Sequence, residues 1–280
     1  MKKFIILSVI ISAFFVTDMF AQMELVWEND SIARKPECIV YDESRDCLYV
    51  SNFNGNPKNG SNYNSDNVCC INLQGEVINS EMIPNLSAPT GMCINNDKLF
   101  VVERFGVVQF DLKSKTVDQR YFIKTMGFLN DVTVDNDGNI YVTESNDSTI
   151  YCIQNGKVDK WLLSKDIYRA NGILFDNGRL IIGINSVNQL KSIDIKDKNI
   201  SVIADMGEGI IDGIKKYKDG YFVSHYEGNL YYVDSEGTIT ELLNTRDKKI
   251  SCADFEFIES KMLFAIPALK NSSVFLYKYK

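Results

Sequence analysis

The chain has 280 residues, of which 45% are apolar and 24% charged, with 17 glycines and 5 prolines. That is enough apolar material for a sizeable core, and it excludes a disordered or fibrous protein. The chain has 30 Lys and Arg against 37 Asp and Glu, and the net charge of −7 argues against a nucleic acid or an anionic membrane as partner. The single histidine excludes any metal site that needs two imidazoles.

The segment 1–21 is typical of a secretory signal peptide. Lys2 and Lys3 precede an apolar run over residues 4–16, and the small residue Ala21 follows. The run is shorter than the roughly 20 residues of a membrane span, although a single anchoring helix is the alternative. We expect cleavage after Ala21 and a mature single domain over residues 22–280, periplasmic or secreted and free of the membrane. No cysteine lies near the cleavage region, so we do not expect a lipoprotein.

The seven cysteines include no CxxC pair and do not form the pattern of a disulfide framework. Cys38, Cys93 and Cys152 lie in apolar strand-like runs, where a buried free thiol is expected. A Cys38–Cys47 disulfide across a hairpin is the alternative.

A similar unit recurs along the chain at nearly constant spacing. Each unit begins with a short turn before an alternating apolar stretch, and the middle residues of the six turns lie at 37, 90, 130, 171, 212 and 254. The intervals between neighbouring turns are 53, 40, 41, 41 and 42. In the third unit we expect strands at 131–135, 140–143, 149–153 and 158–163, separated by turns that contain Asn, Asp or Gly. Four strands per unit of this length are typical of a β-propeller blade.

The sequence therefore predicts an all-β, six-bladed β-propeller with four-stranded blades. The last unit has room for only three strands, so we expect residues 23–28 to supply its outer strand and to close the ring. The longer first interval is due to residues 52–67, which we interpret as a solvated loop; a flap over one mouth of the ring is the alternative. No stretch has the pattern of a long helix.

The six turn residues form a candidate site, because the first strand of a blade is innermost and its entry residue faces the axis. They are Glu37, Thr90, Asn130, Asn171, Asp212 and Asp254. Asn and Asp are also common in turns, but five carboxylates or carboxamides at one position of successive repeats favour a site. Such a convergence of charge is costly unless a cation neutralises it. We expect one divalent metal ion, Ca²⁺ or Zn²⁺ ahead of Mg²⁺ or Mn²⁺.

Four motifs in this order resemble the gluconolactonase/regucalcin (senescence marker protein) family of six-bladed propellers. They are Pro36-Glu37 before a strand ending Leu48-Tyr49-Val50, Asn130-Asp131 in LNDVTVDNDGNIYV, Asn171-Gly172 in ANGILFDNGRLIIGI, and Asp212-Gly213 in IDGIKKYKDGYFVSHYEGNLYYVD.

The resemblance covers residues 36–280. It implies one divalent ion held by Glu37, Asn171 and Asp212, with Asn130 beside it contacting substrate or a metal-bound water. It also implies hydrolysis of sugar-derived or similar lactones, with Asp212 acting as the base.

The sequence also departs from this family. Phe128 stands where the family's lactonases commonly carry an arginine that holds the sugar, and Val142-Thr143-Glu144-Ser145 replaces a stretch of small residues and methionine. These differences indicate an altered substrate wall.

Four further residues are candidates for substrate contact or proton transfer. Asp254 and Glu144 are alternative bases, although an exposed turn carboxylate is the simpler interpretation of each. Arg104 is the best basic residue for an anionic or carbonyl substrate, with a surface salt bridge as the alternative. His225 could donate to substrate or move a proton, or could simply pack. We interpret Tyr226, Tyr231 and Tyr232 as packing between blades.

Our hypothesis from the sequence is an exported, divalent-metal-dependent hydrolase of lactones or related cyclic esters, acting on a small molecule. The alternative is a non-catalytic propeller that binds a small ligand or a protein partner and uses the metal to stiffen its axis.

Overall fold

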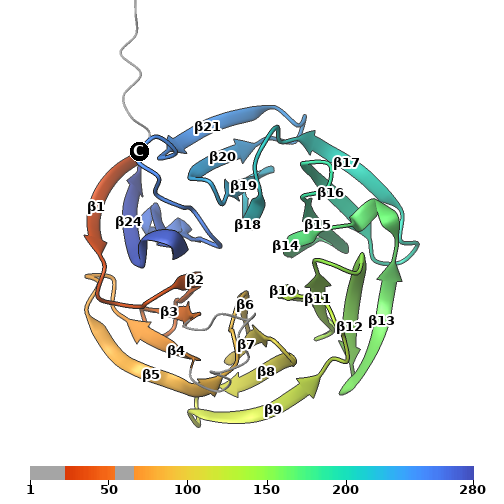
Figure 1. Cartoon of the computed structure of the whole chain (residues 1–280), viewed down its shortest axis with the longest axis horizontal. Coiled ribbons are helices and arrows are strands. Elements are labelled where there is room, and N and C mark those ends of the chain that lie inside the picture. Colours follow the sequence, from red (N-terminus) through yellow and green to blue (C-terminus); the bar gives the residue numbers. More distant parts are fainter. Residues whose placement is uncertain (1–22, 54–65) are drawn as a thin grey trace, which may run out of the picture.

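The computed structural model describes residues 23–53 and 66–280. The predicted signal peptide with its cleavage site, and most of the predicted loop at 52–67, lie outside the described residues. The described part of the chain forms six four-stranded antiparallel sheets that surround a common centre (Figure 1). This confirms the six-bladed β-propeller. None of the helices among the described residues has the length and apolar character needed to cross a membrane.

Within each blade the strands run outward from the axis in chain order. The innermost strands are β2 (Pro36–Asp42), β6 (Met92–Asn95), β10 (Leu129–Val134), β14 (Ala170–Asp176), β18 (Ile211–Tyr217) and β22 (Glu256–Ile258). The second strands are β3 (Cys47–Asn52), β7 (Lys98–Glu103), β11 (Ile140–Glu144), β15 (Arg179–Ile184), β19 (Gly220–His225) and β23 (Leu263–Ala268). The third strands are β4 (Asp66–Ile71), β8 (Gly106–Asp111), β12 (Thr149–Gln154), β16 (Gln189–Asp194), β20 (Asn229–Val233) and β24 (Ser273–Tyr279).

The outer strands are β5 (Val77–Leu86), β9 (Thr116–Phe122), β13 (Lys157–Leu163), β17 (Ile200–Asp205), β21 (Ile239–Asn244) and, for the last blade, β1 (Met23–Asn29). Three short 3-10 helices occur between the described strands: η1 (Lys165–Ile167), η2 (Glu259–Lys261) and η3 (Leu269–Asn271).

The N-terminal strand closes the ring as predicted. Figure 1 shows β1 along the outer side of β24, and the two strands pair from Met23 opposite Tyr279 to Asn29 opposite Val274. On the inside, a parallel bridge joins Cys38 in the first blade to Asp254 before the last. Both β1 and the first inner strand are therefore tied to the last blade by backbone pairing, and β1 covers the outer edge of β24.

Apolar side chains hold neighbouring blades together. Between the fifth and sixth blades the contact is aromatic: the Phe222 ring packs against the rings of Phe257 and Phe264, each at 4.8 Å between ring centres. Most other blade contacts use Ile, Leu and Val. Each such side chain contributes roughly 1.5–3 kcal/mol when fully buried, which makes the ring a rigid support for residues at its axis.

Four inner strands share an irregularity at the end where they enter the ring. Pairing with the second strand shifts register between Pro36 and Ile39 in β2, and at the same place in β10, β14 and β18. A side-chain hydroxyl replaces the missing ladder bond in three blades: Ser51 accepts from Cys38 N, Thr143 from Asp131 N and Ser224 from Gly213 N, at 2.8–3.0 Å. The entry residue and the one after it are thereby freed from the sheet and can face the axis.

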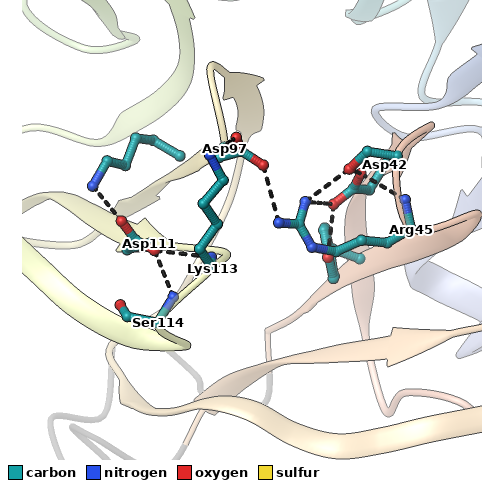
Figure 2. Close-up of polar contacts among 9 residues, drawn as sticks. Asp42, Arg45, Asp97, Asp111, Lys113 and Ser114 are labelled. Carbon is teal, nitrogen blue, oxygen red and sulfur yellow. Dashed lines mark hydrogen bonds and ion pairs between the residues drawn. The ribbon is translucent and has the colours of Figure 1, made fainter.

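A network of ion pairs ties the first two blades together at the opposite ends of these strands. Arg45 bonds Asp42 at 2.7 Å and reaches Asp97 of the next blade at 3.0 Å, and Lys113 bonds the same Asp97 at 2.8 Å (Figure 2). Asp42 is buried and also accepts from Tyr49 Oη at 3.0 Å. Both of these aspartates therefore have cationic partners.

All seven cysteines are free thiols. The alternative Cys38–Cys47 disulfide is not formed, because Cys38 Sγ points to the axis and donates to Asp254 Oδ2 at 2.8 Å. Cys38 is buried as predicted, whereas Cys93 and Cys152 are half-buried.

Candidate functional site

Glu37, Asn171 and Asp212, the three expected metal ligands, occupy equivalent positions at the start of β2, β14 and β18. All three residues are buried, with 9%, 6% and 6% of their surface exposed to solvent. The side-chain amide of Asn171 lowers the pKa of the Asp212 carboxyl, and the charge of Asp212 acts on Glu37, so the three side chains influence one another. The register shift after each strand entry aims these side chains at the axis. Three blades thus contribute to one cluster.

Two oxygen atoms of this cluster are buried without any hydrogen bond from the described residues: Glu37 Oε2 and Asn171 Oδ1. A buried acceptor without a donor costs about 1–3 kcal/mol, and more when it is charged. Burial raises the pKa of Glu37 well above its ordinary value, and the charges of Asp212, Asp254 and Asp131 raise it further. Burial and the charge of Asp254 likewise raise the pKa of Asp212 to about 8.

A divalent cation bound to these oxygen atoms would neutralise the buried, mutually repelling carboxylates. The described residues contain no group of three or more His, Cys, Asp or Glu side chains gathered to hold a metal ion. The expected set is of a different kind, because it has two carboxylates and one carboxamide. Its unpaired oxygen atoms suit a hard, oxygen-preferring ion, so the residues present fit such a group.

A second layer of charge lies near the entries of the inner strands. Asp254 is only 5% exposed. Its carboxylate accepts a hydrogen bond from Cys38 Sγ, and Lys215 Nζ lies 3.9 Å from its Oδ1. Asp131 is only 6% exposed, and its carboxylate accepts hydrogen bonds from the backbone N of Val132 at 2.7 Å and of Ile173 at 2.8 Å. Burial and the charge of Asp254 hold the pKa of Asp131 above its ordinary range despite these bonds.

Glycines next to the entry residues make room for this layer. A Cβ on Gly91 would lie 2.1 Å from Asp131 Oδ1, and one on Gly213 would lie 2.6 Å from Asp254 Oδ1. On Gly172 it would meet the backbone oxygen of Asp212 at 1.8 Å. The glycine after each of Thr90, Asn171 and Asp212 is therefore required by close approach of neighbouring inner strands.

Lys215 is a cation within the axial layer. It follows Asp212 by three positions on β18 and is 20% exposed. Burial by itself would lower its pKa, but Glu256 and Asp254 raise it above the ordinary value. The positive charge of Lys215 therefore partly neutralises the negative charges of Asp254 and Glu256. Asp131 and Lys215 were not singled out from the sequence, although a charged residue inside an otherwise apolar inner strand was the available signal.

The two remaining entry residues differ in exposure. Thr90 is 1% exposed, and its hydroxyl faces the backbone oxygen of Leu129 at 3.5 Å, so it joins two blades. Asn130 is half-buried, and its side chain makes no hydrogen bond with any described residue. Its amide is therefore available to a ligand in the mouth of the ring.

Glu144 has a structural environment. It is fully buried at the end of β11, and its oxygens accept from the backbone N of Phe128 at 2.5 Å, of Asn146 at 3.2 Å and of Asp147. A Cβ on Gly127 would collide with it. Glu144 is thus not the exposed turn carboxylate of our simpler interpretation. We assign it the role of holding the two loops on either side of Phe128 and do not retain it as a base.

Arg104 and His225 have different surroundings. Arg104 is half-buried after β7, and its guanidinium lies 5.9 Å from the centre of the Phe105 ring.

His225 is fully buried, and neither of its ring nitrogens bonds to a described residue. Its ring meets Tyr231 edge-on at 5.0 Å. Burial lowers the pKa of His225 to about 4, so it is neutral at physiological pH. Gly209 covers it, because a Cβ there would collide with Nδ1.

Tyr226 makes a contact between blades, because Lys270 of the sixth blade lies 4.5 Å from the centre of its ring, and it is also affected by the charges of the candidate site. Burial, followed by the charges of Asp212 and Glu37, raises its pKa to about 12. Tyr231, in contrast, packs on His225, and Tyr232 joins the aromatic cluster between blades. The sequence signal was that Tyr226 directly follows the second strand, where loops surround the mouth.

Comparisons with known proteins agree on the fold. No family model and no curated relative matches the chain. Among solved structures, a gluconolactonase of Xanthomonas campestris superposes with a TM-score of 0.71 at 15% identity, over 89% of this chain and 87% of that one.

Two lyases are also similar in structure. A streptogramin B lyase has a TM-score of 0.68 at 13% identity and covers 92% of this chain and 97% of its own. A virginiamycin B lyase of Staphylococcus aureus, solved with quinupristin, has a TM-score of 0.63 at 14% identity, over 91% and 98% of the two chains. At such identities the similarity establishes the fold alone; the structural neighbours of this six-bladed propeller include a gluconolactonase, in agreement with the resemblance seen in the sequence.

Proposed function

We propose that this protein is an exported, divalent-metal-dependent hydrolase of lactones or related cyclic esters. The observation that carries the proposal is the pair of buried, unbonded oxygen atoms on Glu37 and Asn171 beside the protonation-prone carboxylate of Asp212. Buried polar atoms with a purely structural role are nearly always paired, whereas ligand sites leave such atoms open. The fold shared with a gluconolactonase supports the same reaction class. Export rests on the signal-peptide pattern of segment 1–21.

Glu37, Asn171 and Asp212 would hold the metal. When bound, a divalent ion supplies Lewis acidity to a carbonyl oxygen and acidity to a coordinated water. The amide of Asn171 would favour the charged form of Asp212, because it lowers the pKa of that carboxyl. Asp212 would accept the proton of the attacking water on a carboxylate oxygen, since a base whose pKa is tuned upward toward neutrality is suited to that transfer.

The wall of the mouth would position the substrate. Asn130 has a free amide that can bond a ring or carbonyl oxygen. Phe128 presents a half-buried ring where an arginine would favour a polyhydroxylated sugar, and its backbone is fixed by Glu144 at 2.5 Å. We therefore favour lactones with fewer hydroxyl groups than a sugar lactone.

A panel of lactones assayed by proton release tests this function. We expect ring opening that needs a divalent ion, stops with a chelator, and falls about 10³-fold in the Asp212→Asn variant, the scale of removing one essential catalytic group. Asp137→Asn is the matched control, because it removes the same charge from an exposed turn in another blade, at the end of the inner strand opposite to its entry. It should leave the rate unchanged.

The alternative function makes a different prediction in the same assay. A non-catalytic propeller would bind the divalent ion, with a rise in melting temperature that Asp212→Asn abolishes, but would open no lactone of the panel. Metal binding without turnover would therefore replace the hydrolase with a binding protein. Absence of metal binding would remove the ion from both accounts.

A further inference from the structure

Tyr226 and Lys270 form a pair at the mouth of the ring, on the connections that follow β19 and β23. Lys270 Nζ lies 4.5 Å from the centre of the Tyr226 ring, within the range of a cation–π contact. Tyr226 is half-buried and Lys270 exposed, so the phenol lies under the ammonium group. Neither side chain contributes to the aromatic cluster between the blades.

Backbone hydrogen bonds fix this pair to the strand entries that carry the candidate site. Tyr226 N donates to Ile210 O at 2.8 Å, two positions before Asp212. Cys252 N donates to Tyr226 O at 3.2 Å, two positions before Asp254. Lys270 N donates to the buried Ser251 Oγ at 3.0 Å. Tyr226 and Lys270 therefore hold a set position relative to the buried carboxylates.

The polar atoms of the pair are unused. Among the described residues no carboxylate lies within 4.0 Å of Lys270 Nζ, and no group forms a hydrogen bond with Tyr226 Oη. The opposite holds for the ion-pair network of Figure 2, where Arg45 and Lys113 both have acidic partners. An ammonium group without a carboxylate partner and a phenol without a hydrogen bond, on loops tied to the entries of the candidate metal ligands, are available to a ligand.

We propose that Tyr226 and Lys270 determine substrate specificity, selecting lactones that carry a carboxylate substituent. This inference rests on the proposed function and names its substrate class. The lactone carbonyl would lie over Glu37, Asn171 and Asp212. The separate carboxylate would bind Lys270 Nζ, while Tyr226 Oη donates a hydrogen bond to the same anion. A neutral lactone would leave both groups without a partner.

Two matched lactones test the proposal: γ-butyrolactone, which is neutral, and 5-oxotetrahydrofuran-2-carboxylate, which adds one carboxylate to the same ring. We expect wild type to prefer the second in kcat/KM, chiefly through KM, and added salt to reduce this preference because it screens the exposed ammonium. Lys270→Met keeps an apolar stem against the ring and should lower the ratio of the two kcat/KM values about tenfold. Tyr226→Phe should lower it less, because the cation remains.

Lys278→Met is the control for net charge, because this exposed lysine lies on β24 and should leave the ratio unchanged. A ratio that is the same in wild type, Lys270→Met and Lys278→Met would overturn the proposal. Equal melting temperatures for the three proteins would establish that altered folding does not explain a change.

Calorimetry with the ring-opened products separates this inference from the proposed function. In the presence of the divalent ion, 2-hydroxyglutarate should bind wild type more tightly than 4-hydroxybutyrate does, and Lys270→Met should remove that difference. If no lactone is hydrolysed but this result holds, the hydrolase proposal fails and the anion site stands. If the two products bind wild type equally, the anion site fails whatever the activity.

Discussion

Two ends of the same propeller use aspartate and glutamate in opposite ways. At the mouth, Glu37 and Asp212 are buried with unpaired or repelling neighbours, and the pKa of Asp212 rises to about 8. In the network of Figure 2, Asp42 is also buried, and burial alone would raise its pKa, but bonds from Ser44, Arg45 and Tyr49 bring it below the ordinary value. Both groups are buried, so the neighbours decide the sign: a cation and two hydroxyl donors lower the pKa of Asp42, whereas the charge of another carboxylate, Asp254, adds to burial in raising that of Asp212.

The contrast separates structural from functional charge. Asp42 is satisfied within the fold and adds stability, whereas the carboxylates at the mouth cost stability until a ligand arrives. Lys215 offsets part of that cost through its ion pair with Asp254. The following predictions test whether the two ends differ as the structure indicates.

The largest difference should appear in the pH dependence of stability without metal. Because the pKa of Asp212 is raised in the folded state, that state holds a proton which the unfolded chain releases, and stability falls as pH rises from about 4 to about 8. Each unit of pKa separation corresponds to about 1.4 kcal/mol. Urea unfolding in chelator across this range measures the fall.

The same experiment distinguishes the two ends. Asp212→Asn should flatten the fall between pH 4 and 8. The pKa of Asp42 is lowered, so the stability that Asp42 provides is present above its ordinary pKa and is lost as pH falls below about 4. A metal-free protein that is equally stable at pH 5 and pH 8 would contradict the buried, unpaired state of the mouth.

Divalent metal should produce the next largest effect. At a free ion concentration about 100 times the dissociation constant, binding to the folded state alone adds about 2.7 kcal/mol to the free energy of unfolding. Thermal unfolding with Ca²⁺, Zn²⁺, Mg²⁺ and Mn²⁺ in turn identifies the preferred ion. Glu37→Gln should remove most of this stabilisation while leaving the metal-free protein at least as stable as wild type, since it removes a buried charge.

Removing Asp42 should have the opposite sign to removing Glu37. Asp42→Asn weakens the bonds to Arg45, Ser44 and Tyr49 and should lower the free energy of unfolding by about 2 kcal/mol, the scale of a hydrogen bond to a charged group. Metal binding should be unchanged, because the residue lies at the other end of the inner strand. A loss of metal-dependent stabilisation would show that the two ends are coupled.

The exposed margin of the network should matter least. Lys113 is 74% exposed in its contact with Asp97, and exposed ion pairs contribute little because water and salt screen them. Lys113→Met should therefore leave urea unfolding indistinguishable from wild type. A clear destabilisation would mean that the network acts as a unit in which every charge is needed.

Repeat spacing and local alternation determined the architecture without reference to tertiary structure. The pattern of the third unit predicts strands at 131–135, 140–143, 149–153 and 158–163, and the strands are Leu129–Val134, Ile140–Glu144, Thr149–Gln154 and Lys157–Leu163. Strands and tight turns depend on neighbours close along the chain, so the sequence specifies them. The role of the N-terminal strand also followed, because a three-stranded last unit requires a fourth strand from elsewhere.

Only the tertiary structure decided which polar side chains have partners. Cys38 and Asp254 are 216 positions apart and meet at 2.8 Å, Glu144 accepts hydrogen bonds from loop amides, and Lys270 lies over the ring of Tyr226 in the neighbouring blade. No local pattern encodes these contacts, because they form when six separate units close into a ring. The residue type at each strand entry could be read along the chain, but whether its charge is neutralised depends on the five other blades.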